Sequence, residues 1–152
     1  MSSTSPRTTR NRPASRVVMA LMGIGLIVGM AGACTKDQQP LESLFYVNKA
    51  RESAHLPDLA WNDQLAAKAQ AWAERMASTN QLAHSNLVDG VGRGWSYLGE
   101  NVGCGGSVHD VHEGFMNSKT HRDAILGHEF SSVGVGVAER GGKIWIAQVF
   151  EG

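Results

Sequence analysis

Cysteine is almost absent from the chain, which has only Cys34 and Cys104 among its 152 residues. A framework of several disulfides is therefore excluded. If Cys34 carries a lipid, as its surroundings suggest, Cys104 has no partner within the chain. We expect Cys104 to be a small, buried, apolar residue.

An excess of positive charge is also missing. The chain has 14 Lys and Arg and 14 Asp and Glu residues, and four of the arginines but no acid precede Cys34. The remainder therefore carries ten basic residues against fourteen acidic ones. A mildly acidic domain without a basic stripe argues against nucleic acid as a partner. The sequence shows no internal repeat, and its length leaves room for one ordinary domain.

Residues 1–33 indicate an export segment. A basic lead containing Arg7, Arg10, Arg12 and Arg16 is followed by an apolar run from Val17 to Ala33. This order is typical of a secretory signal, although an uncleaved membrane anchor has a similar pattern. No two arginines are adjacent, which disfavours a twin-arginine signal. Residues 34–40 read as a short polar tether between the membrane and the domain.

Cys34 decides among the modes of export. Met30-Ala31-Gly32-Ala33-Cys34 resembles a bacterial lipobox, in which the cysteine is acylated and becomes the new N-terminus. Ala31-x-Ala33 also suits ordinary signal peptidase, which cuts the same bond. We favour the lipoprotein, held by lipidated Cys34 at the outer face of the cytoplasmic membrane. Free secretion and an uncleaved anchor are the alternatives.

Residues 41–152 read as an α+β domain. Apolar spacing and capping residues predict four helices: Leu41–Ala54, a second from Asn62 or Asp63 to about Ser78–Asn80, a third after Ser107 and a short fourth after Ser118. Tyr97–Gly103 is expected to be extended. Alternating valines from Val133 and the return segment Ile144–Phe150 flank Gly141-Gly142, which is a strong hairpin signal. Helices followed by a hairpin suggest a sheet covered by helices.

Three short islands carry the chemistry of the chain. They are His84-Ser85, Gly99-Glu100-Asn101 and Ser118-Lys119-Thr120-His121-Arg122. Two imidazoles and one carboxylate, if they converge, make a site for a divalent metal such as Zn²⁺ or for acid–base work. The candidate metal ligands are therefore His84, Glu100 and His121.

These islands belong to a longer ordered set of motifs. The set comprises Asn48-x-x-Arg51, Leu59-Ala60-Trp61, Leu65-Ala66, Ala83-His84-Ser85, Gly99-Glu100-Asn101, Phe115-x-x-Ser118-x-x-His121-Arg122, Ile125-Leu126, Val133-Gly134-Val135-Gly136 and Trp145-x-x-Gln148-Val149-Phe150. In this order it resembles the CAP superfamily of cysteine-rich secretory, antigen 5 and pathogenesis-related proteins, especially its short bacterial branch. The resemblance runs from about Leu41 to Phe150.

The resemblance implies a three-layer α–β–α sandwich with a small, largely antiparallel sheet and a cleft holding two histidines and acidic residues. His84, Glu100 and His121 fall on matching positions. The second glutamate of larger eukaryotic members aligns at or near Ser118 here, and Glu113 is expected to face solvent. The chain therefore departs from the complete four-residue cleft, and the eukaryotic disulfides are absent.

Each site residue also has a structural interpretation. His84 and His121 can be exposed histidines of a loop and a helix, and the motif match favours the cleft for both. Glu100 can be a structural carboxylate that orients a histidine. Asn101 is expected to brace the loop through its amide, and Ser118 to cap a helix. The Ser118 hydroxyl can also point into the cleft, so Ser118 is a candidate cleft residue together with His84, Glu100 and His121.

Other aromatic and imidazole side chains are assigned structural places. His109 and His112 have metal-ligand spacing but no evident third ligand, so a solvated or partly packed helix face is expected. Three tryptophans are expected in the core: Trp61, Trp72 and Trp145. Trp95 is placed at a groove rim.

Three functions are compatible with these residues. A module that binds a lipid or a divalent metal at the cell envelope ranks first, with the membrane as a partner. A structural or signalling envelope protein ranks second. An enzyme ranks third: Ser85 or Ser118 with a histidine base, or metal-activated water, would give a hydrolase, but neither serine lies in a recognisable nucleophile elbow.

Overall fold

The computed structural model describes Met1 and residues 38–152. The predicted export segment, Cys34 and most of the tether lie outside the described residues. The described chain forms these elements in order: α1 (Gln39–Ser53), β1 (Ala60–Trp61), α2 (Asp63–Thr79), β2 (Leu98–Gly105), α3 (Val108–Asn117), α4 (Lys119–Ile125), β3 (Ser132–Arg140) and β4 (Lys143–Glu151). Within residues 38–152, every helix is too short or too polar to cross a membrane.

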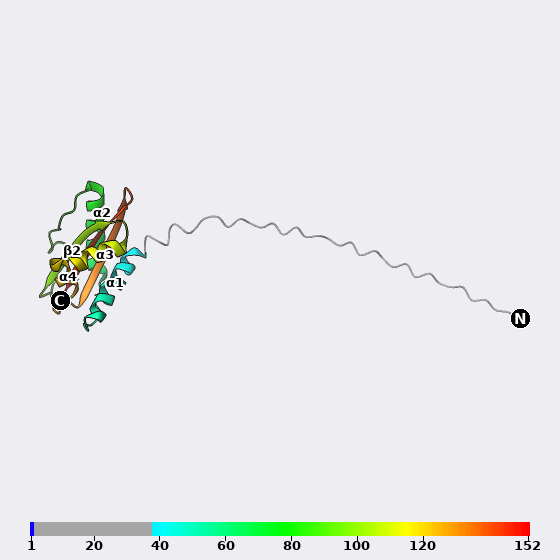
Figure 1. Cartoon of the computed structure of the whole chain (residues 1–152), viewed down its shortest axis with the longest axis horizontal. Helices are drawn as coiled ribbons and strands as arrows, with labels where there is room; N and C mark the ends of the chain where they lie inside the picture. The colour runs from blue at the N-terminus through cyan, green and yellow to red at the C-terminus, as the bar shows by residue number, and fades with distance from the viewer. Residues whose placement is uncertain (2–37) are drawn as a thin grey trace.

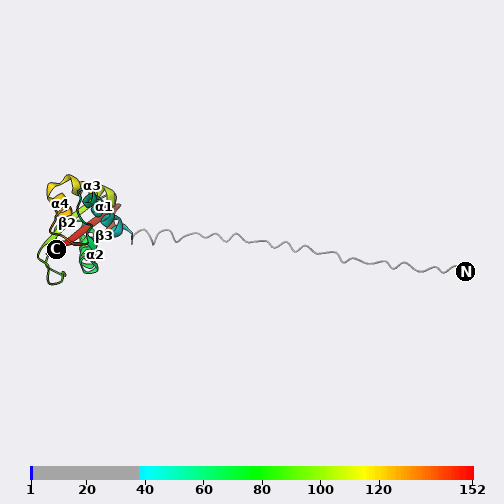
Figure 2. The same cartoon turned by 90° about the horizontal axis from the view of Figure 1, so that it is seen from below.

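One four-stranded sheet forms the middle layer, with strand order β1-β3-β4-β2. β1 pairs with β3 in parallel, and the other two pairings are antiparallel. Helix α2 covers one face, while α1, α3 and α4 lie on the other, as Figure 2 shows; Figure 1 gives the same elements in a view turned by 90°. This confirms the predicted α+β, three-layer α–β–α sandwich with a largely antiparallel sheet.

Alternation along β4 divides the core into two halves. Ile144, Ile146 and Phe150 point toward α1, α3 and α4, whereas Trp145, Ala147 and Val149 point toward α2. Successive side chains of a strand face opposite sides of a sheet, so a strand buried on both faces has a continuous apolar run. The central place of β4 explains why the segment Ile144–Phe150 is apolar except for Gln148.

Helix α2 packs directly on the backbone of β3. A Cβ atom added at Gly134 would lie 2.0 Å from the backbone nitrogen of Ala66, and one at Gly136 would lie 2.1 Å from that of Gln70. No side chain fits between helix and strand at these two positions. The two glycines that alternate with valine in β3 therefore set the distance between the layers.

The starts of α2 and α3 agree with the predicted caps. The side chain of Asn62 accepts hydrogen bonds from the backbone N–H groups of Gln64 and Leu65 at the start of α2, and Ser107 accepts one from Asp110 at the start of α3. These bonds satisfy N–H groups that a helix cannot pair internally. The predicted hairpin is also present, with positive φ at both turn glycines, Gly141 and Gly142.

Some predictions differ from the structure. Cys104 is exposed, not buried, because it lies on edge strand β2 on the face that carries α2, and α2 packs over β3 and β4 instead of β2. Helix α1 begins two residues early, at Gln39, since Pro40 has a φ suited to a first turn. β1 was missed because two residues show no alternation. Of the predicted core tryptophans, only Trp145 is fully buried; Trp61 and Trp72 are half-buried.

Candidate functional site

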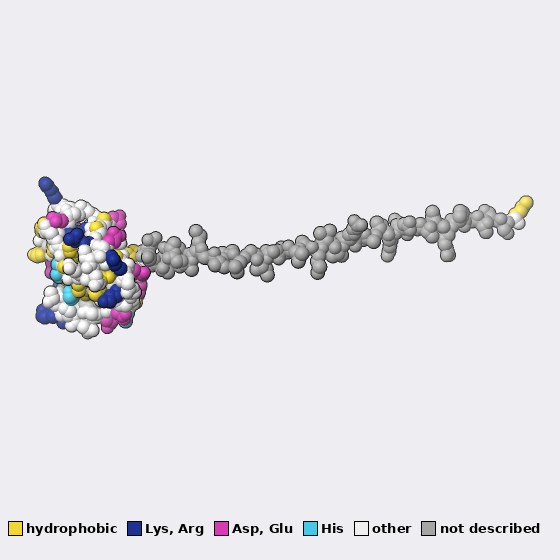
Figure 3. Space-filling model, turned by 90° about the horizontal axis from the view of Figure 1, so that it is seen from above, with side chains coloured by type: hydrophobic (Ala, Val, Ile, Leu, Met, Phe, Trp, Pro, Cys, Tyr) yellow, Lys and Arg dark blue, Asp and Glu magenta, His cyan; other side chains and the backbone are white. Residues whose placement is uncertain are grey.

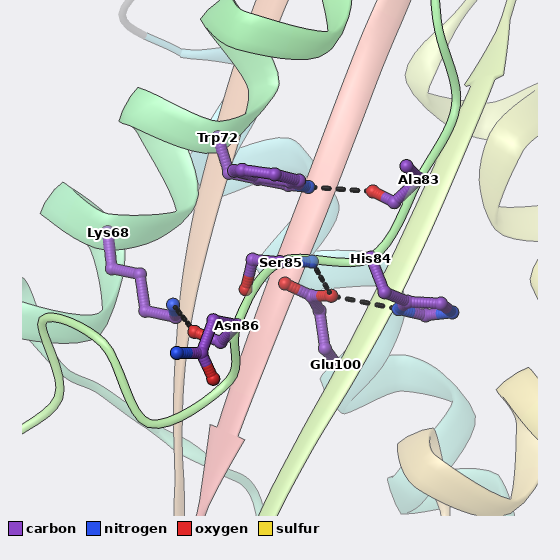
Figure 4. A network of polar contacts seen from close by, with 7 residues as sticks. All are labelled: Lys68, Trp72, Ala83, His84, Ser85, Asn86 and Glu100. Carbon is purple, nitrogen blue, oxygen red and sulfur yellow. Dashed lines mark hydrogen bonds and ion pairs between the residues drawn. The ribbon is translucent and has the colours of Figure 1, made fainter.

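The segment after α2 brings His84 to the sheet. Asn80 ends the helix in the left-handed conformation, with φ 52° and ψ 36°, which asparagine tolerates better than most residues. Two side chains of α2 then hold the segment: Trp72 Nε1 donates to the carbonyl of Ala83 (2.7 Å) and Lys68 Nζ to that of Asn86 (2.8 Å). In Figure 4 both reach the segment from one side, while the His84 ring lies on the other, over β2.

His84 and Glu100 form the centre of the site. Nδ1 of His84 lies 2.8 Å from Oε2 of Glu100, and the backbone N–H of Ser85 donates to the same oxygen at 2.9 Å. An ionised carboxylate only accepts hydrogen bonds, so Nδ1 of His84 carries the donated proton. Its other nitrogen, Nε2, is then left for a proton, a metal ion or a ligand.

Burial differs sharply between the two partners. The Glu100 side chain is 3% exposed and that of His84 is 60% exposed. The carboxylate is thus a buried support and the imidazole is the group presented to solvent. A buried ionised group needs several partners, and Glu100 gets two on one oxygen.

Two oxygens beside this pair have no hydrogen-bond partner among residues 38–152. They are Oε1 of Glu100 and the hydroxyl of Ser85, both buried. Figure 4 shows them directed toward the same space between α2 and β2. Groups of this kind in native proteins ordinarily bind ordered water. The Ser85 hydroxyl is therefore not held by either histidine as an activated nucleophile would be.

His121 reaches the site from the opposite layer. Its ring packs against Phe115 with centroids 5.1 Å apart, and its backbone carbonyl accepts a hydrogen bond from Nδ2 of Asn101 at 3.1 Å. Burial lowers the pKa of His121 below its ordinary value, and the positive charge of His84 lowers it further. The two imidazoles are thus close enough for the charge on one to affect the other.

Asn101 uses its amide as a brace, as predicted, but between strand β2, helix α4 and strand β4 and not within a loop. It is fully buried beside Glu100 in β2 and also donates to Oε1 of Gln148 at 3.2 Å, whose own Nε2 donates to the hydroxyl of Ser43 at 3.0 Å. This chain of buried amides joins α1, the sheet and α4. It fixes the position of His121 relative to Glu100.

The structure separates the predicted site residues into two kinds. His84 and Glu100 are in direct contact, and His121 lies nearby without contacting the carboxylate. Among residues 38–152, no three His, Cys, Asp or Glu side chains form a group that could hold a metal ion. The geometry gives Glu100 the part of an orienting group, while the three-ligand metal set remains a prediction.

Ser118 has the predicted place in the chain without the expected bond. It is the N-cap residue of α4, but its side chain makes no capping hydrogen bond. Glu113 is exposed, as expected from the helix stripe. The sequence did not predict that Lys68 and Trp72 hold the segment Ala83–Asn86. The helical periodicity of α2 does not indicate which loop its side chains contact.

The other histidine pair packs against an aromatic ring. His112 stacks on Tyr46 at a centroid distance of 5.3 Å and is buried, and exposed His109 meets the same ring edge-on at 5.4 Å. Burial lowers the pKa of His112. This pair is thus the partly packed helix face that the sequence predicted.

The surface charge is mixed on the face seen in Figure 3. Lys and Arg side chains lie among Asp and Glu, and histidines lie near hydrophobic and uncharged groups. No large area of one sign is visible on this face.

Comparison with known proteins defines the class. The family model described as "Cysteine-rich secretory protein family" (CAP) matches residues 44–150. The chain therefore belongs to the CAP family, as its motifs predicted.

Bacterial relatives share this domain. The uncharacterised protein YkwD of Bacillus subtilis is 29% identical over 110 residues, which are 66% of this chain and 42% of that protein. The solved structure of an extracellular SCP-domain protein from Bacillus anthracis has a TM-score of 0.67 and 26% identity, covering 76% of this chain and 41% of that one. A cysteine-rich secretory protein from Staphylococcus aureus gives 0.65 and 21%, covering 77% and 39%. The chain thus spans about two fifths of these relatives.

Proposed function

We propose that this protein is an exported CAP domain that binds a divalent cation, with Zn²⁺ as the first candidate, through Nε2 of His84 and the ring of His121. The observation that carries the proposal is the hydrogen bond between Nδ1 of His84 and the buried carboxylate of Glu100. Metal-binding histidines commonly donate their second ring N–H to a carboxylate in this way, which fixes the tautomer and makes the free nitrogen more basic.

The chemistry of the donors favours a nitrogen-binding metal. Imidazole suits Zn²⁺, whereas Mg²⁺ takes oxygen ligands. Glu100 already accepts two hydrogen bonds at Oε2, so its part is to orient His84. Two protein ligands leave positions open for water or for a small ligand. The lowered pKa of His121 keeps this ring neutral, and hence able to bind a metal, at neutral pH.

Calorimetric titration with Zn²⁺, and with Mg²⁺ as the matched metal, tests the proposal. We expect saturable Zn²⁺ binding, no comparable Mg²⁺ binding, and loss of Zn²⁺ binding in the His84→Ala/His121→Ala variant. His128→Ala is the control, because His128 is exposed in a loop. Unchanged Zn²⁺ affinity in the double variant would contradict the proposed site.

A structural role is the second candidate, since Glu100 also pins Ser85 through its backbone N–H. The Glu100→Gln variant distinguishes the structural role from the metal-binding role. In the structural case, amide hydrogen exchange of residues 81–90 rises and no Zn²⁺ affinity exists to be lost. In the metal case, the affinity for Zn²⁺ falls about 10- to 100-fold, as is typical when such an orienting partner is removed.

Export and tethering are also part of the proposal. Residues 1–33 have the order of a secretory signal, and the matched Bacillus anthracis protein is described as extracellular. Cell fractionation with Cys34→Ser tests the anchor. Movement of this variant from the membrane to the soluble exported fraction supports acylation, while retention in the membrane indicates an uncleaved anchor only where the unmutated chain also keeps residues 1–33, as its mass shows.

A further inference from the structure

Helix α1 has large apolar side chains on a side that the domain leaves uncovered. Leu41 is 55% exposed and Phe45 is 60% exposed, although both lie in a regular helix. The opposite side of α1 is buried through Ser43, Val47 and Arg51. The core therefore accounts for one side of the helix and leaves the other without a partner.

The exposed residues follow one row. Leu41 and Phe45 are four residues apart, so they are neighbours on the helix surface, and Lys49 continues the row after four more. Together with Leu44 they line a groove of about 510 Å³ that also includes Asn48, Glu52 and Asp58. The row thus has two large apolar side chains followed by a lysine whose stem can lie along an apolar surface.

The length of chain before α1 limits where this row can be. Four residues, 35–38, separate Cys34 from the first residue of α1. The five Cα-to-Cα steps from Cys34 to Gln39, at about 3.5 Å each, place the start of α1 within about 18 Å of an anchor at Cys34. Figure 1 shows that α1 starts at the outer edge of the domain.

We propose that the exposed row of α1, formed by Leu41, Phe45 and Lys49, docks on the phospholipid surface in which the chain is anchored. This inference rests on the proposed membrane anchor and adds a defined orientation of the domain. Lys49 is already paired with Glu52 at 2.8 Å, so docking depends mainly on apolar contact and not on anionic lipid. The tether brings the row to the membrane, and insertion of two side chains holds it there.

Site-specific photo-crosslinking in the full chain tests this orientation. The photoreactive residue p-benzoylphenylalanine replaces Phe45 in the membrane fraction of intact cells, and Ala71 in a matched variant. Ala71 is exposed on α2, on the opposite face of the sheet. We expect phospholipid adducts at position 45, detected by mass spectrometry, at least several times above those at position 71. Adding Leu41→Ser should remove most of them.

Other outcomes would overturn the inference. An adduct at position 45 to a second copy, to another protein or to residues 17–33 would show that a different partner covers the row. Equal lipid adducts at positions 45 and 71 would show that the domain has no fixed orientation. A chain in the membrane fraction without lipid adducts at position 45 refutes docking alone, whereas a soluble chain refutes the proposed anchor and docking together. Zn²⁺ titration is independent of both.

Discussion

Replacing Arg51 by Met is expected to cost this domain a large part of its stability. Arg51 is 2% exposed and lies on the buried side of α1. Its guanidinium donates to the backbone carbonyls of Pro57 at 2.8 Å, Ile125 at 3.0 Å and Gly127 at 2.8 Å, with a longer contact to Phe130 at 3.4 Å. One side chain thus satisfies the loop after α1 and the loop after α4.

The magnitude follows from the three short bonds. Hydrogen bonds to a charged group contribute about 1.5–3 kcal/mol each, and a buried carbonyl left unpaired costs about 1–3 kcal/mol. Burial also lowers the pKa of Arg51, because removing the charged guanidinium from water costs free energy. The Met variant does not have this desolvation cost, which offsets part of the stability lost with the hydrogen bonds. We expect the free energy of unfolding to fall by about 3–5 kcal/mol, from a total of about 5–15 kcal/mol.

Urea unfolding followed by tryptophan fluorescence measures this change. With a slope of about 2 kcal/mol per M, the midpoint should fall by about 2 M. Exposed Arg93 supplies the control, and Arg93→Met should shift the midpoint by less than about 0.3 M. If Arg51→Met shifted it by less than about 0.5 M, the carbonyls would be satisfied in another way and the reasoning would be wrong.

Two further predictions concern the sheet and the histidines. Gly136→Ala should lower the melting temperature by at least about 5 °C, because the new Cβ would meet the backbone of α2; an unchanged melting curve, followed by circular dichroism, would show that the helix moves away freely. The free energy of unfolding should also decrease as the pH is lowered below the ordinary histidine pKa of 6.5. Burial lowers the pKa of His112 and His121 in the folded chain, so in this range the unfolded chain binds more protons than the folded one. Urea midpoints at pH 7.5 and 5.5 measure this, and His112→Gln should reduce the difference; a midpoint higher at pH 5.5 would contradict the assignment.

The fold was predictable because its signals are local. Caps at Asn62 and Ser107, the helical period of α2 and the double glycine of the hairpin each depend on a few neighbouring residues. The two-residue strand β1 and the exposure of Cys104 were not predictable, since both depend on where the sheet ends relative to the helices. The periodicity of apolar residues along the sequence does not indicate where the sheet ends.

The sequence grouped the candidate site residues, and the structure shows the contact between His84 and Glu100, but the different roles of the residues were not predictable. The motifs identified His84, Glu100 and His121, and the sequence alone offered all three as ligands. The structure shows that strand alternation directs Glu100 toward α2 and Asn101 toward α4, and that Glu100 Oε2 is already used by His84 and Ser85. Such a division depends on contacts between residues 15 to 20 positions apart.

The contact between Asn101 and Gln148 has a consequence for the pairing of the edge strand. The glycines of β2 already restrict this pairing: a Cβ would lie 2.8 Å from Phe130 at Gly99, 2.7 Å from Phe115 at Gly103 and 2.9 Å from Val111 at Gly105. Sliding β2 by one residue along β4 would therefore place larger side chains in filled space. A slide would direct Asn101 to the other face, leave Gln148 without its partner in the dry interior, and turn Glu100 away from His84. The buried amide pair therefore favours the same register as the glycines, and only this register brings the carboxylate beneath the imidazole.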